Sequence, residues 1–236
     1  MKNNWQAVWN KRQDRFSEID LNDQEKVFME LIRLDGYDIT TAISYESFMN
    51  EFETNQKNLQ LVSNEKVFEV GCGSGAVLYK FFCDGFKIGG LDYSEKQIEN
   101  LKKVFKPEDL IECIRDEAIN LPTEIKYDAV FCHSAFEYFS NLEYAETVVE
   151  KMIEKSTKSI GIFGTYDESK REQFYEFRRS KDENYNEHYK DLPKQFYSRN
   201  FFEDIASKHG MQVKFEESKL AGYWNRDFIF NVYLIK

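Results

Sequence analysis

The feature that most constrains the fold is a strand-like run that passes through a glycine-rich turn directly into a helical run, at residues 67–82 (VFEVGCGSGAVLYKFF). Its glycines, Gly71, Gly73 and Gly75, permit a tight turn and let a ligand lie against the backbone. The start of the following helix supplies amide donors and partial positive charge. The segment therefore predicts a ligand-binding turn between a buried strand and a helix.

Short β-like runs alternate with helical patterns from residue 66 onward. One helical segment, Ser94 to Phe105, begins with Ser94 as an expected N-cap and has Gln97 at the capping-box spacing. The alternation predicts an α/β fold with a doubly wound, mostly parallel sheet covered by helices. The β-like runs, each too short for a helix, are residues 66–70, 86–92, 109–115, 126–132 and 159–164.

The two ends of the chain differ from this middle part. Apolar residues recur at helical spacing before residue 62, so a helical cap is expected there. The runs MQVKFEE and FIFNVYLIK predict a terminal antiparallel hairpin at the sheet edge. No linker-like composition separates these parts, and one domain over residues 1–236 is expected. Its parts are an N-terminal helical cap (1–62), a core (63–164), an inserted helical cap after the fifth strand (165–200), and a final helix with the strand hairpin (201–236).

Acidic residues follow the second and third β-like runs. Asp92 lies 21 residues after Gly71, where doubly wound geometry places a carboxylate beside the ribose hydroxyls of an adenosine. The third run ends at the pair Asp116 and Glu117. Because the carboxyl ends of parallel strands meet at one edge of the sheet, three successive strand ends offer polar groups to one ligand.

At these residues the chain resembles the class I S-adenosylmethionine-dependent methyltransferases. The first motif of that family is an acidic residue, an apolar residue and then G-x-G-x-G, and residues 69–75 (EVGCGSG) match it throughout. The resemblance is strong over residues 60–165 and weak over the C-terminal strand pair. It implies a seven-stranded sheet with a reversed last strand, S-adenosylmethionine as cofactor and S-adenosylhomocysteine as product.

The resemblance also implies roles for individual residues. The glycines of the turn would approach the methionine portion of the cofactor, Asp92 would hold the ribose, Tyr93 would flank the adenine, and Asp116 would address its exocyclic amine. The residues expected to bind the cofactor are Glu69, Gly71, Cys72, Gly73, Asp92, Tyr93, Ser94, Asp116, Glu117, Ala118, Cys132, His133, Trp9 and Arg12.

The loop after the fourth run is where the family contacts the methyl acceptor. His133 is the side chain there that could take a proton near neutral pH, and is the candidate catalytic residue, although packing at a strand end also fits its position. Glu137 could orient the acceptor but is expected to face water. The loop lacks the Asp/Asn-Pro-Pro-aromatic tetrad of nucleic-acid amino-methyltransferases and the aspartates of metal-dependent catechol-type enzymes. No nucleic-acid acceptor and no metal are predicted.

Residues 165–200 are dense in Tyr and Arg and look too polar to be core. Arg178, Arg179 and Arg199 could hold a carboxylate or phosphate, but solvated charge pairs are expected for at least two of them. At the other end of the chain, Trp5, Trp9 and Arg12 share a helical face that could act as a lid. The expected acceptor-binding residues are Tyr37, Glu137, Arg178, Tyr185 and Tyr189.

Composition limits the partners. The chain has 32 Lys and Arg against 42 Asp and Glu, a net charge of −10 that opposes binding to a phosphate backbone. No apolar run is long enough for a membrane span, and the N-terminus lacks the apolar core of a signal peptide, so a soluble cytoplasmic protein is expected. The four cysteines lack the spacing of a zinc cluster or disulfide framework and are expected to be reduced.

The sequence thus predicts a methyltransferase acting on an oxygen or nitrogen atom of a small, polar or anionic metabolite. An NAD(P)-dependent oxidoreductase is an alternative, because Gly71, Gly73 and Ala76 also satisfy G-x-G-x-x-A. Glu69 argues against it, since a carboxylate at the turn would repel a pyrophosphate. A non-catalytic S-adenosylmethionine-binding protein is the third hypothesis.

Overall fold

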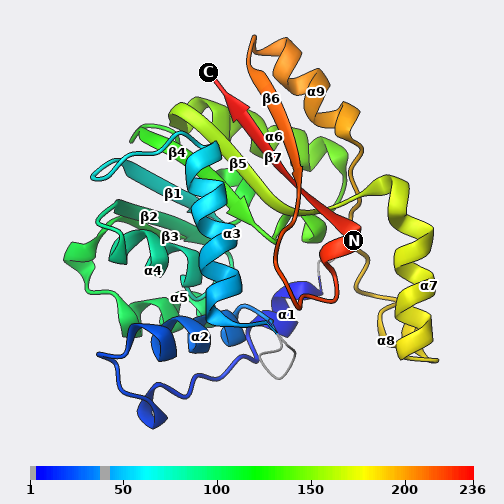
Figure 1. Cartoon of the computed structure of the whole chain (residues 1–236), viewed down its shortest axis with the longest axis horizontal. Coiled ribbons are helices and arrows are strands. Elements are labelled where there is room, and N and C mark those ends of the chain that lie inside the picture. The colour runs from blue at the N-terminus through cyan, green and yellow to red at the C-terminus, as the bar shows by residue number, and fades with distance from the viewer. Residues whose placement is uncertain (1–3, 38–42) are drawn as a thin grey trace.

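A seven-stranded sheet forms the centre of the computed structural model, which describes residues 4–37 and 43–236 (Figure 1). The strand order is β3-β2-β1-β4-β5-β7-β6. β7 runs antiparallel to both of its neighbours, and the other pairs are parallel. The predicted doubly wound sheet and its reversed last strand are confirmed. The strands are β1 (Lys66–Val70), β2 (Lys87–Asp92), β3 (Leu110–Arg115), β4 (Tyr127–His133), β5 (Ser156–Tyr166), β6 (Gln212–Glu217) and β7 (Ile229–Ile235).

Helices cover both faces of the sheet and extend beyond it at the two caps (Figure 1). The helices are α1 (Trp5–Trp9), α2 (Gln24–Leu34), α3 (Tyr45–Asn58), α4 (Ala76–Cys83), α5 (Glu95–Val104), α6 (Leu142–Lys155), α7 (Arg171–Lys181), α8 (Tyr185–His188) and α9 (Arg199–Lys208). Short 3-10 turns join them: η1 (Phe16–Glu18), η2 (Pro107–Asp109), η3 (Ala118–Asn120), η4 (Phe136–Tyr138), η5 (Glu168–Lys170) and η6 (Arg226–Phe228). Within the described ranges, no helix is both long and apolar enough to cross a membrane.

The alternation of side chains along each strand divides the core into two layers. In β4, Phe131 packs with α2, α3, α4 and α5, whereas Val130 and Cys132 pack with α6 and α9 on the opposite face. Although the chain is polar overall, both core layers are well filled. Each contains completely buried aromatic rings, such as Phe28 and Phe202. Both faces of the central strands are therefore dry, as expected of a parallel sheet.

Local capping explains where helix α5 begins. The Ser94 side chain accepts a hydrogen bond from the Gln97 amide, which confirms the predicted N-cap. The reciprocal bond of a capping box is not formed. The Gln97 side chain instead donates to the carbonyl oxygen of Leu34 at 3.0 Å and to Asp35 Oδ1 at 3.2 Å. The spacing therefore predicted the start of the helix, but the Gln97 side chain forms hydrogen bonds with the N-terminal cap and not with the N-cap residue.

The N-terminal cap is built from α2 and α3. Phe28 packs against Phe48 and Phe52, with ring centroids 5.6 and 6.0 Å apart. α2 ends at Leu34 in a turn at residues 35–36, and residues 38–42 lie outside the described residues. The cap adds an apolar layer that is continuous with the core beneath the sheet.

The inserted segment between β5 and α9 forms a small core of its own. Phe174 and Phe196 are buried there with Tyr166 and Ile229. The expectation that residues 165–200 are too polar to be core is therefore wrong, because a few aromatic side chains gather on the inner side of α7. Many polar residues of the segment, such as Arg179, are exposed, but Asp167 is buried. In the orientation of Figure 1, α7 and α8 form a separate lobe at the lower right.

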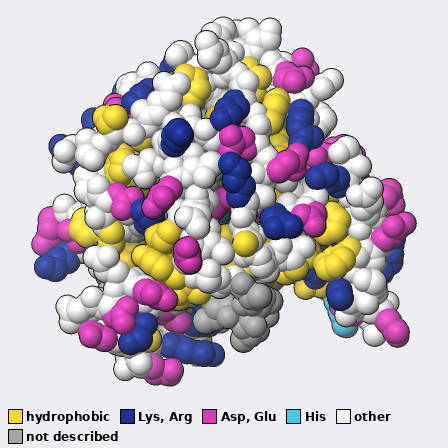
Figure 2. Space-filling view, in the orientation of Figure 1, with side chains coloured by type: hydrophobic (Ala, Val, Ile, Leu, Met, Phe, Trp, Pro, Cys, Tyr) yellow, Lys and Arg dark blue, Asp and Glu magenta, His cyan; other side chains and the backbone are white. Residues whose placement is uncertain are grey.

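The surface shown in Figure 2 mixes charges of both signs. Lys and Arg side chains alternate with Asp and Glu across the face over β6, β7 and α3. On this view of the described chain there is no continuous basic stripe of the kind that follows a phosphate backbone.

One buried ion pair joins α6 to β3. Lys155 is fully buried, with its Nζ 2.8 Å from Glu112 Oε2 and 2.9 Å from the carbonyl oxygen of Pro122. The ammonium also lies 4.4 Å from the centre of the Phe68 ring. Removing one partner of such a pair leaves the other desolvated and unpaired.

Lys155→Met is therefore expected to lower the free energy of unfolding by about 3 kcal/mol, measured by urea denaturation. The matched control is Lys158→Met, which breaks the more exposed pair with Glu65 and should cost less than about 1 kcal/mol. Equal losses in the two variants would contradict a special cost at Lys155.

Candidate functional site

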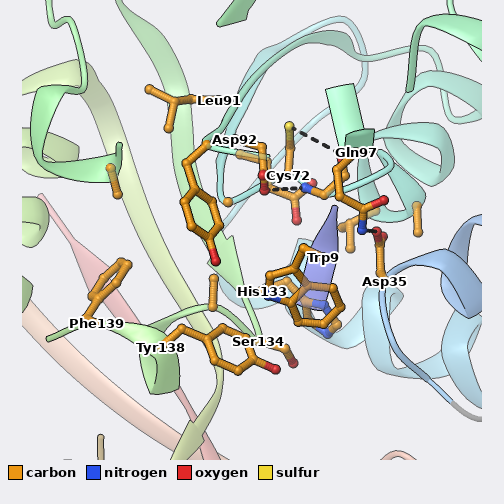
Figure 3. Close-up of a pocket in the computed structure, with 18 of the residues that line it drawn as sticks. Trp9, Asp35, Cys72, Leu91, Asp92, Gln97, His133, Ser134, Tyr138 and Phe139 are labelled. Carbon is orange, nitrogen blue, oxygen red and sulfur yellow. Dashed lines mark hydrogen bonds between the residues drawn. The ribbon is translucent and has the colours of Figure 1, made fainter. Parts of the chain in front are cut away.

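A cavity of about 310 Å³ opens at the carboxyl ends of β1, β2 and β4. The cavity lies at the edge of the sheet where the strand order reverses between the neighbouring strands β1 and β4, the switch point at which ligands of doubly wound sheets bind. Figure 3 shows side chains from the N-terminal cap, the glycine turn and the loop after β4 meeting there. The lining residues are Trp9, Ile32, Asp35, Tyr37, Glu69, Gly71, Cys72, Gly73, Ala76, Val77, Leu91, Asp92, Tyr93, Gln97, Glu117, Ala118, His133, Ser134, Ala135, Tyr138, Phe139, Ser140 and Tyr144.

The glycine turn adopts a backbone that side chains would not tolerate. Gly71 has φ +72° and Gly73 has φ +53°, both in the left-handed region that favours glycine. A Cβ atom at Gly71 would lie 2.8 Å from Ala135 Cβ, and one at Gly73 would lie 2.4 Å from Asp35 Oδ1. The turn therefore exposes bare backbone to the cavity and also lets the two neighbouring loops close against it.

Asp92 ties the glycine turn to the loop after β2. Its Oδ2 accepts a hydrogen bond from the Gly73 amide at 2.9 Å, and its Oδ1 accepts one from the Ser94 amide at 2.8 Å. Burial raises the pKa of Asp92 to about 6, and these amide bonds only partly offset that effect. Asp92 is thus held in place at the cavity wall before any ligand arrives.

Carboxylates dominate the charge of the cavity wall. Asp35, Glu69, Asp92 and Glu117 all line it, and none of the described lining residues is Lys or Arg. Glu69 is 2% exposed, and its Oε2 has no hydrogen-bond partner. Burial, together with the nearby charge of Asp35, raises the pKa of Glu69 well above its usual range. An unpartnered buried carboxyl in an acidic wall fits a ligand that carries positive charge.

The adenine end of the expected site is less charged. The hydroxyl of Tyr93 lines the cavity, is buried and has no hydrogen-bond partner in the structure. Glu117, in the loop after β3, accepts a hydrogen bond from the Tyr144 hydroxyl at 3.2 Å. Ala118 also lines the cavity. These groups leave both a free hydroxyl and an apolar surface for a flat ring.

His133 forms a small polar cluster with Tyr37 and Ser134. The Tyr37 hydroxyl lies 2.9 Å from Ser134 Oγ and 3.4 Å from His133 Nε2. The rings of Tyr37 and His133 stack with centroids 5.9 Å apart, and Phe52 meets the histidine edge-on at 5.5 Å. Burial lowers the pKa of His133 to about 4, so the imidazole is neutral at neutral pH.

The backbone around this cluster is also fixed. Ser134 has φ +51°, an uncommon conformation for a residue with a side chain. Gly164 of β5 makes room for it, because a Cβ there would lie 2.6 Å from Ser134 Oγ. The Gly164 amide donates to Asn231 Oδ1 of β7 at 2.9 Å. The position of Ser134 therefore depends on strands that lie far from it in the sequence.

Helix α1 lies over the cavity. Trp9 lines it and meets the ring of Tyr138 edge-on, with centroids 5.5 Å apart. The Gln6 side chain donates to the carbonyl oxygen of Tyr93 at 3.2 Å, and Trp5 Nε1 donates to the carbonyl oxygen of Pro193 at 3.1 Å. Figure 3 shows the Trp9 ring among the side chains that line the cavity. The helix thus bridges the adenine side of the cavity and the inserted cap.

Several residues expected to bind the cofactor do not line the cavity. The Arg12 guanidinium stacks on Trp9 at 5.5 Å from the ring centre. Asp116 Oδ1 accepts a hydrogen bond from the Glu117 amide of its own loop at 2.7 Å. Ser94 is the buried N-cap of α5, and Cys132 is buried in the opposite layer of the core because it follows Phe131 in the strand. These residues support the cavity from behind.

Glu137 does not face water as expected. It is 4% exposed, and its Oε1 lies 3.9 Å from the Lys194 ammonium. The 3-10 turn η4 directs the side chain inward, toward the inserted cap. The Lys194 ammonium lies 4.6 Å from the centre of the Tyr138 ring, and burial lowers its pKa to about 8. The pair joins the acceptor loop to the insertion and does not reach the cavity wall.

The three arginines of the insertion that were considered as anion-binding residues are in different situations. Arg199 pairs with Asp167 at 2.9 Å and Glu217 at 2.7 Å. Arg179 is exposed. Arg178 lies over three aromatic rings, at 4.7 Å from Tyr185, 5.1 Å from Tyr189 and 4.9 Å from Trp224.

Sequence reasoning missed Asp35, Ser134 and Tyr138 as cavity residues. Asp35 stands two residues before Tyr37, which the sequence did single out, and Tyr138 lies in the loop after β4. Both positions could have been considered from their place in the chain. Nothing in the sequence marks which side chain of either loop turns inward, because that depends on the packing of α1 and the caps.

Comparison with known proteins gives a family match over the core. The family described as "Methyltransferase domain" matches residues 68–159, which run from β1 into β5. The nonribosomal peptide synthetase dtxS1 of Metarhizium robertsii (strain ARSEF 23 / ATCC MYA-3075) is 29% identical over 100 residues. That alignment covers 39% of this chain but spans only about 1% of the synthetase.

Solved structures share the fold across most of the chain. The plantazolicin methyltransferase BpumL, in complex with a triazolic desmethylPZN analogue and SAH, has a TM-score of 0.60 at 16% identity, covering 100% of this chain and 95% of BpumL. The magnesium protoporphyrin IX methyltransferase ChlM of Synechocystis PCC 6803, with bound SAM, has a TM-score of 0.56 at 14% identity, covering 99% and 90%. N-methyltransferase NodS of Bradyrhizobium japonicum WM9 has a TM-score of 0.58 at 8% identity, covering 81% and 97%.

Three observations now agree: the glycine turn with its acidic neighbours, the strand order with a reversed β7, and the family match from β1 to β5. Residues 68–159 match the methyltransferase-domain family, and the chain has the fold of the class I S-adenosylmethionine-dependent methyltransferases.

Proposed function

We propose that this chain transfers a methyl group from S-adenosylmethionine to an oxygen or nitrogen atom of a small polar acceptor. The observation that carries the proposal is the acidic cavity at the glycine turn, with the unpartnered Glu69 Oε2 in its wall. A sulfonium cofactor with an ammonium group brings the positive charge that this wall lacks. A dinucleotide would instead bring two phosphates into it, which favours the methyltransferase over the oxidoreductase hypothesis.

The lining residues fit the cofactor part by part. The bare backbone of Gly71 and Gly73 would contact the methionine portion, Asp92 would hold the ribose, and Tyr93 with Ala118 would border the adenine. The bound cofactor supplies a methyl group already activated by positive sulfur. The work left to the protein is to align the acceptor, exclude water and accommodate a proton.

His133 is proposed to orient the acceptor through its ring nitrogen. Because the imidazole is neutral at neutral pH, it can accept a hydrogen bond from an acceptor hydroxyl or amine. Its low pKa makes it a weaker base than an ordinary histidine, so it holds the acceptor proton more than it removes it. Tyr37 and Ser134 fix the ring and offer a second polar contact.

The acceptor's distal end is proposed to lie at Arg178 in the inserted cap. The rings of Tyr185, Tyr189 and Trp224 cover the faces of the guanidinium, and no described acidic side chain pairs with it. Stacking of this kind leaves the in-plane N–H donors available to a carboxylate or phosphate.

A chain of rings connects Arg178 with the cavity. Trp224 lies 6.0 Å from Tyr223, and Tyr223 lies 5.1 Å from Tyr37. Since the cavity wall itself is acidic, an anionic group on the acceptor is expected at Arg178 and not beside His133. Glu137 takes part only through its buried pair with Lys194, which holds the acceptor loop against the cap.

Cofactor binding should be visible by thermal melting. At about 100 times its dissociation constant, S-adenosylhomocysteine adds about 2.7 kcal/mol to stability. For a chain of this size the melting temperature is expected to rise by about 5–10 °C. NAD serves as the control and should leave it unchanged. A rise with NAD and none with S-adenosylhomocysteine would overturn the proposal.

The imidazole of His133 is expected to titrate near pH 4. Its pKa in the folded protein lies below the ordinary value of 6.5, so the imidazole stays neutral as the pH falls from 8 to 6. The stability linked to this lowered pKa is present above about pH 6.5. It is lost as the pH falls below that value, because the histidine of the unfolded chain then takes up a proton and the buried one does not. Imidazole resonances in ¹H–¹⁵N NMR spectra, assigned with His133→Gln, measure the midpoint. A midpoint above 6 would contradict the burial argument.

Arg178→Met should remove a preference for anionic acceptors. In a screen of acceptor acids against their methyl esters, S-adenosylhomocysteine production by the wild type is expected to favour the acid, and the variant should raise KM for the acid by about tenfold with little change in kcat. Arg179→Met, one residue away on the exposed side, is the matched control. An unchanged preference in Arg178→Met would show that this arginine only packs.

A further inference from the structure

Strand β5 contains a β-bulge where it pairs with β7. The register of the two strands shifts between Ile162 and Thr165, so that two residues of β5 lie opposite Asn231 of β7. Such a bulge bends the strand and redirects the side chains beside it. At its second residue, Gly164, φ is +72°, and the Gly164 amide donates a hydrogen bond to Asn231 Oδ1 at 2.9 Å. The bulge is thus held by the side chain of the residue opposite it.

The bulge supports the polar cluster around His133. The Ser134 amide donates to the carbonyl oxygen of Phe163 at 2.9 Å, and the absence of a side chain at Gly164 leaves room for Ser134 Oγ. Ser134 Oγ lies 2.9 Å from the Tyr37 hydroxyl, which lies 3.4 Å from His133 Nε2. Figure 3 shows Ser134 and His133 among the side chains of the cavity. The arrangement of three cavity side chains therefore depends on the bulge.

The Asn231 side chain can take only one orientation. It is 3% exposed, in a strand whose neighbouring side chains are apolar and buried. Its Oδ1 accepts from the Gly164 amide, while its Nδ2 donates to Glu51 Oε1 of α3 at 2.8 Å. Because an amide N–H donates and a carboxylate accepts, turning the Asn231 amide around would break both hydrogen bonds. Glu51 therefore decides which side of Asn231 faces the bulge.

Glu51 is an expensive residue to use for this purpose alone. Its side chain is 6% exposed, and its other oxygen accepts a hydrogen bond from the Lys219 amide at 2.8 Å. Burying a carboxylate costs more desolvation energy than burying a neutral group. In return, a charged acceptor forms a stronger and more directional hydrogen bond with the Asn231 amide. The pair thus favours a fixed geometry over simple apolar packing.

The same face of α3 also touches the cluster directly. Phe52, the residue after Glu51, meets the His133 ring edge-on with centroids 5.5 Å apart. Phe48, one turn earlier, meets the Tyr37 ring at 5.3 Å. Residues three and four apart share a helix face, so one face of α3 contacts the cluster through its rings and supports it through Glu51.

We propose that Glu51 and Asn231 are positioning residues for methyl transfer, which hold the bulge of β5 so that Ser134, Tyr37 and His133 keep the arrangement that orients the acceptor. The inference rests on the proposed function, because it assumes that the acceptor binds at His133. Neither Glu51 nor Asn231 is among the described side chains that line the cavity. Both also lie outside residues 68–159, the part of the chain that matches the methyltransferase-domain family.

Asn231→Leu tests the proposal by removing both hydrogen bonds without adding a charge. Released from Asn231, the bulge should let water reach the cluster, so the NMR midpoint of His133 should rise by about one pH unit from its value of about 4 and its imidazole resonances should broaden. Binding of S-adenosylhomocysteine, measured by calorimetry, should change less than about twofold. With the acid that is most active in the acceptor screen, kcat should fall by about tenfold.

A double variant should rescue the arrangement. In Asn231→Asp combined with Glu51→Gln, the new carboxylate accepts from the Gly164 amide and from the new side-chain amide, whose oxygen still accepts from the Lys219 amide. Each single change instead sets two carboxyl groups against each other or leaves one oxygen to serve two donors. The double variant should therefore show narrow imidazole resonances and a kcat within about twofold of the wild type, whereas each single variant should resemble Asn231→Leu.

Asn55→Leu is the matched control for lost stability. Asn55 is also a buried asparagine of this region, and its Oδ1 accepts from the Tyr233 hydroxyl at 2.6 Å. The change should lower the melting temperature but leave the bond between Gly164 and Asn231 in place, so the midpoint of His133 should not move. If Asn231→Leu does not fold, Glu51→Gln is compared with Asn55→Leu in its place.

The possible outcomes distinguish the inference from the proposed function. A lower melting temperature with an unchanged His133 midpoint in Asn231→Leu would show that the pair only stabilises the fold. An equal rise of the midpoint in Asn55→Leu, or a double variant no better than the single ones, would also overturn the inference and leave the methyltransferase proposal intact. A wild type that does not bind S-adenosylhomocysteine would contradict the proposed function and the inference with it.

Discussion

The backbone of the turn between β1 and α4 is the constraint on which the rest of the site depends. Gly71 and Gly73 take left-handed φ values, and neighbouring atoms occupy the space where their side chains would be. The loop after β4 packs against Gly71 through Ala135, and the N-terminal cap packs against Gly73 through Asp35. Asp92 accepts a hydrogen bond from the Gly73 amide. Because Gly71 and Gly73 have no side chains, neighbouring segments can pack closely against the turn. Three segments that are distant in the sequence therefore converge within reach of one ligand.

The electrostatics of the cavity indicate what kind of ligand fits at this point of convergence. Carboxyl groups are gathered in a partly desolvated wall, where burial raises the pKa of Asp35 to about 7 and that of Asp92 to about 6. Such an arrangement is unfavourable until positive charge enters it. His133 has the opposite response to the same burial, which keeps its imidazole neutral. The wall at the glycine turn is thus acidic, whereas the part of the cavity at His133 is uncharged.

The two caps lie outside residues 68–159, the part of the chain that matches the methyltransferase-domain family. The inserted cap folds around Phe174 and Phe196 and presents Arg178 among aromatic rings from α8 and the loop before β7. The N-terminal cap lays α1 over the cavity and delivers Asp35 into it. Relatives that share the sheet act on acceptors as different as those printed in their names, because the sheet positions the cofactor while the caps shape what approaches it.

The sequence by itself determined the sheet, the glycine turn, the position of Asp92 and the Ser94 cap, because strand alternation, glycine conformation and helix capping act over a few neighbouring residues. Only the tertiary structure decided which polar groups became buried or came to line the cavity. Glu137 reads as a surface residue until Lys194 packs beside it, and His133 reads as an ordinary base until Phe52 and Tyr37 desolvate it. Burial and charge pairing arise from residues far apart in the chain, so no local pattern can encode them.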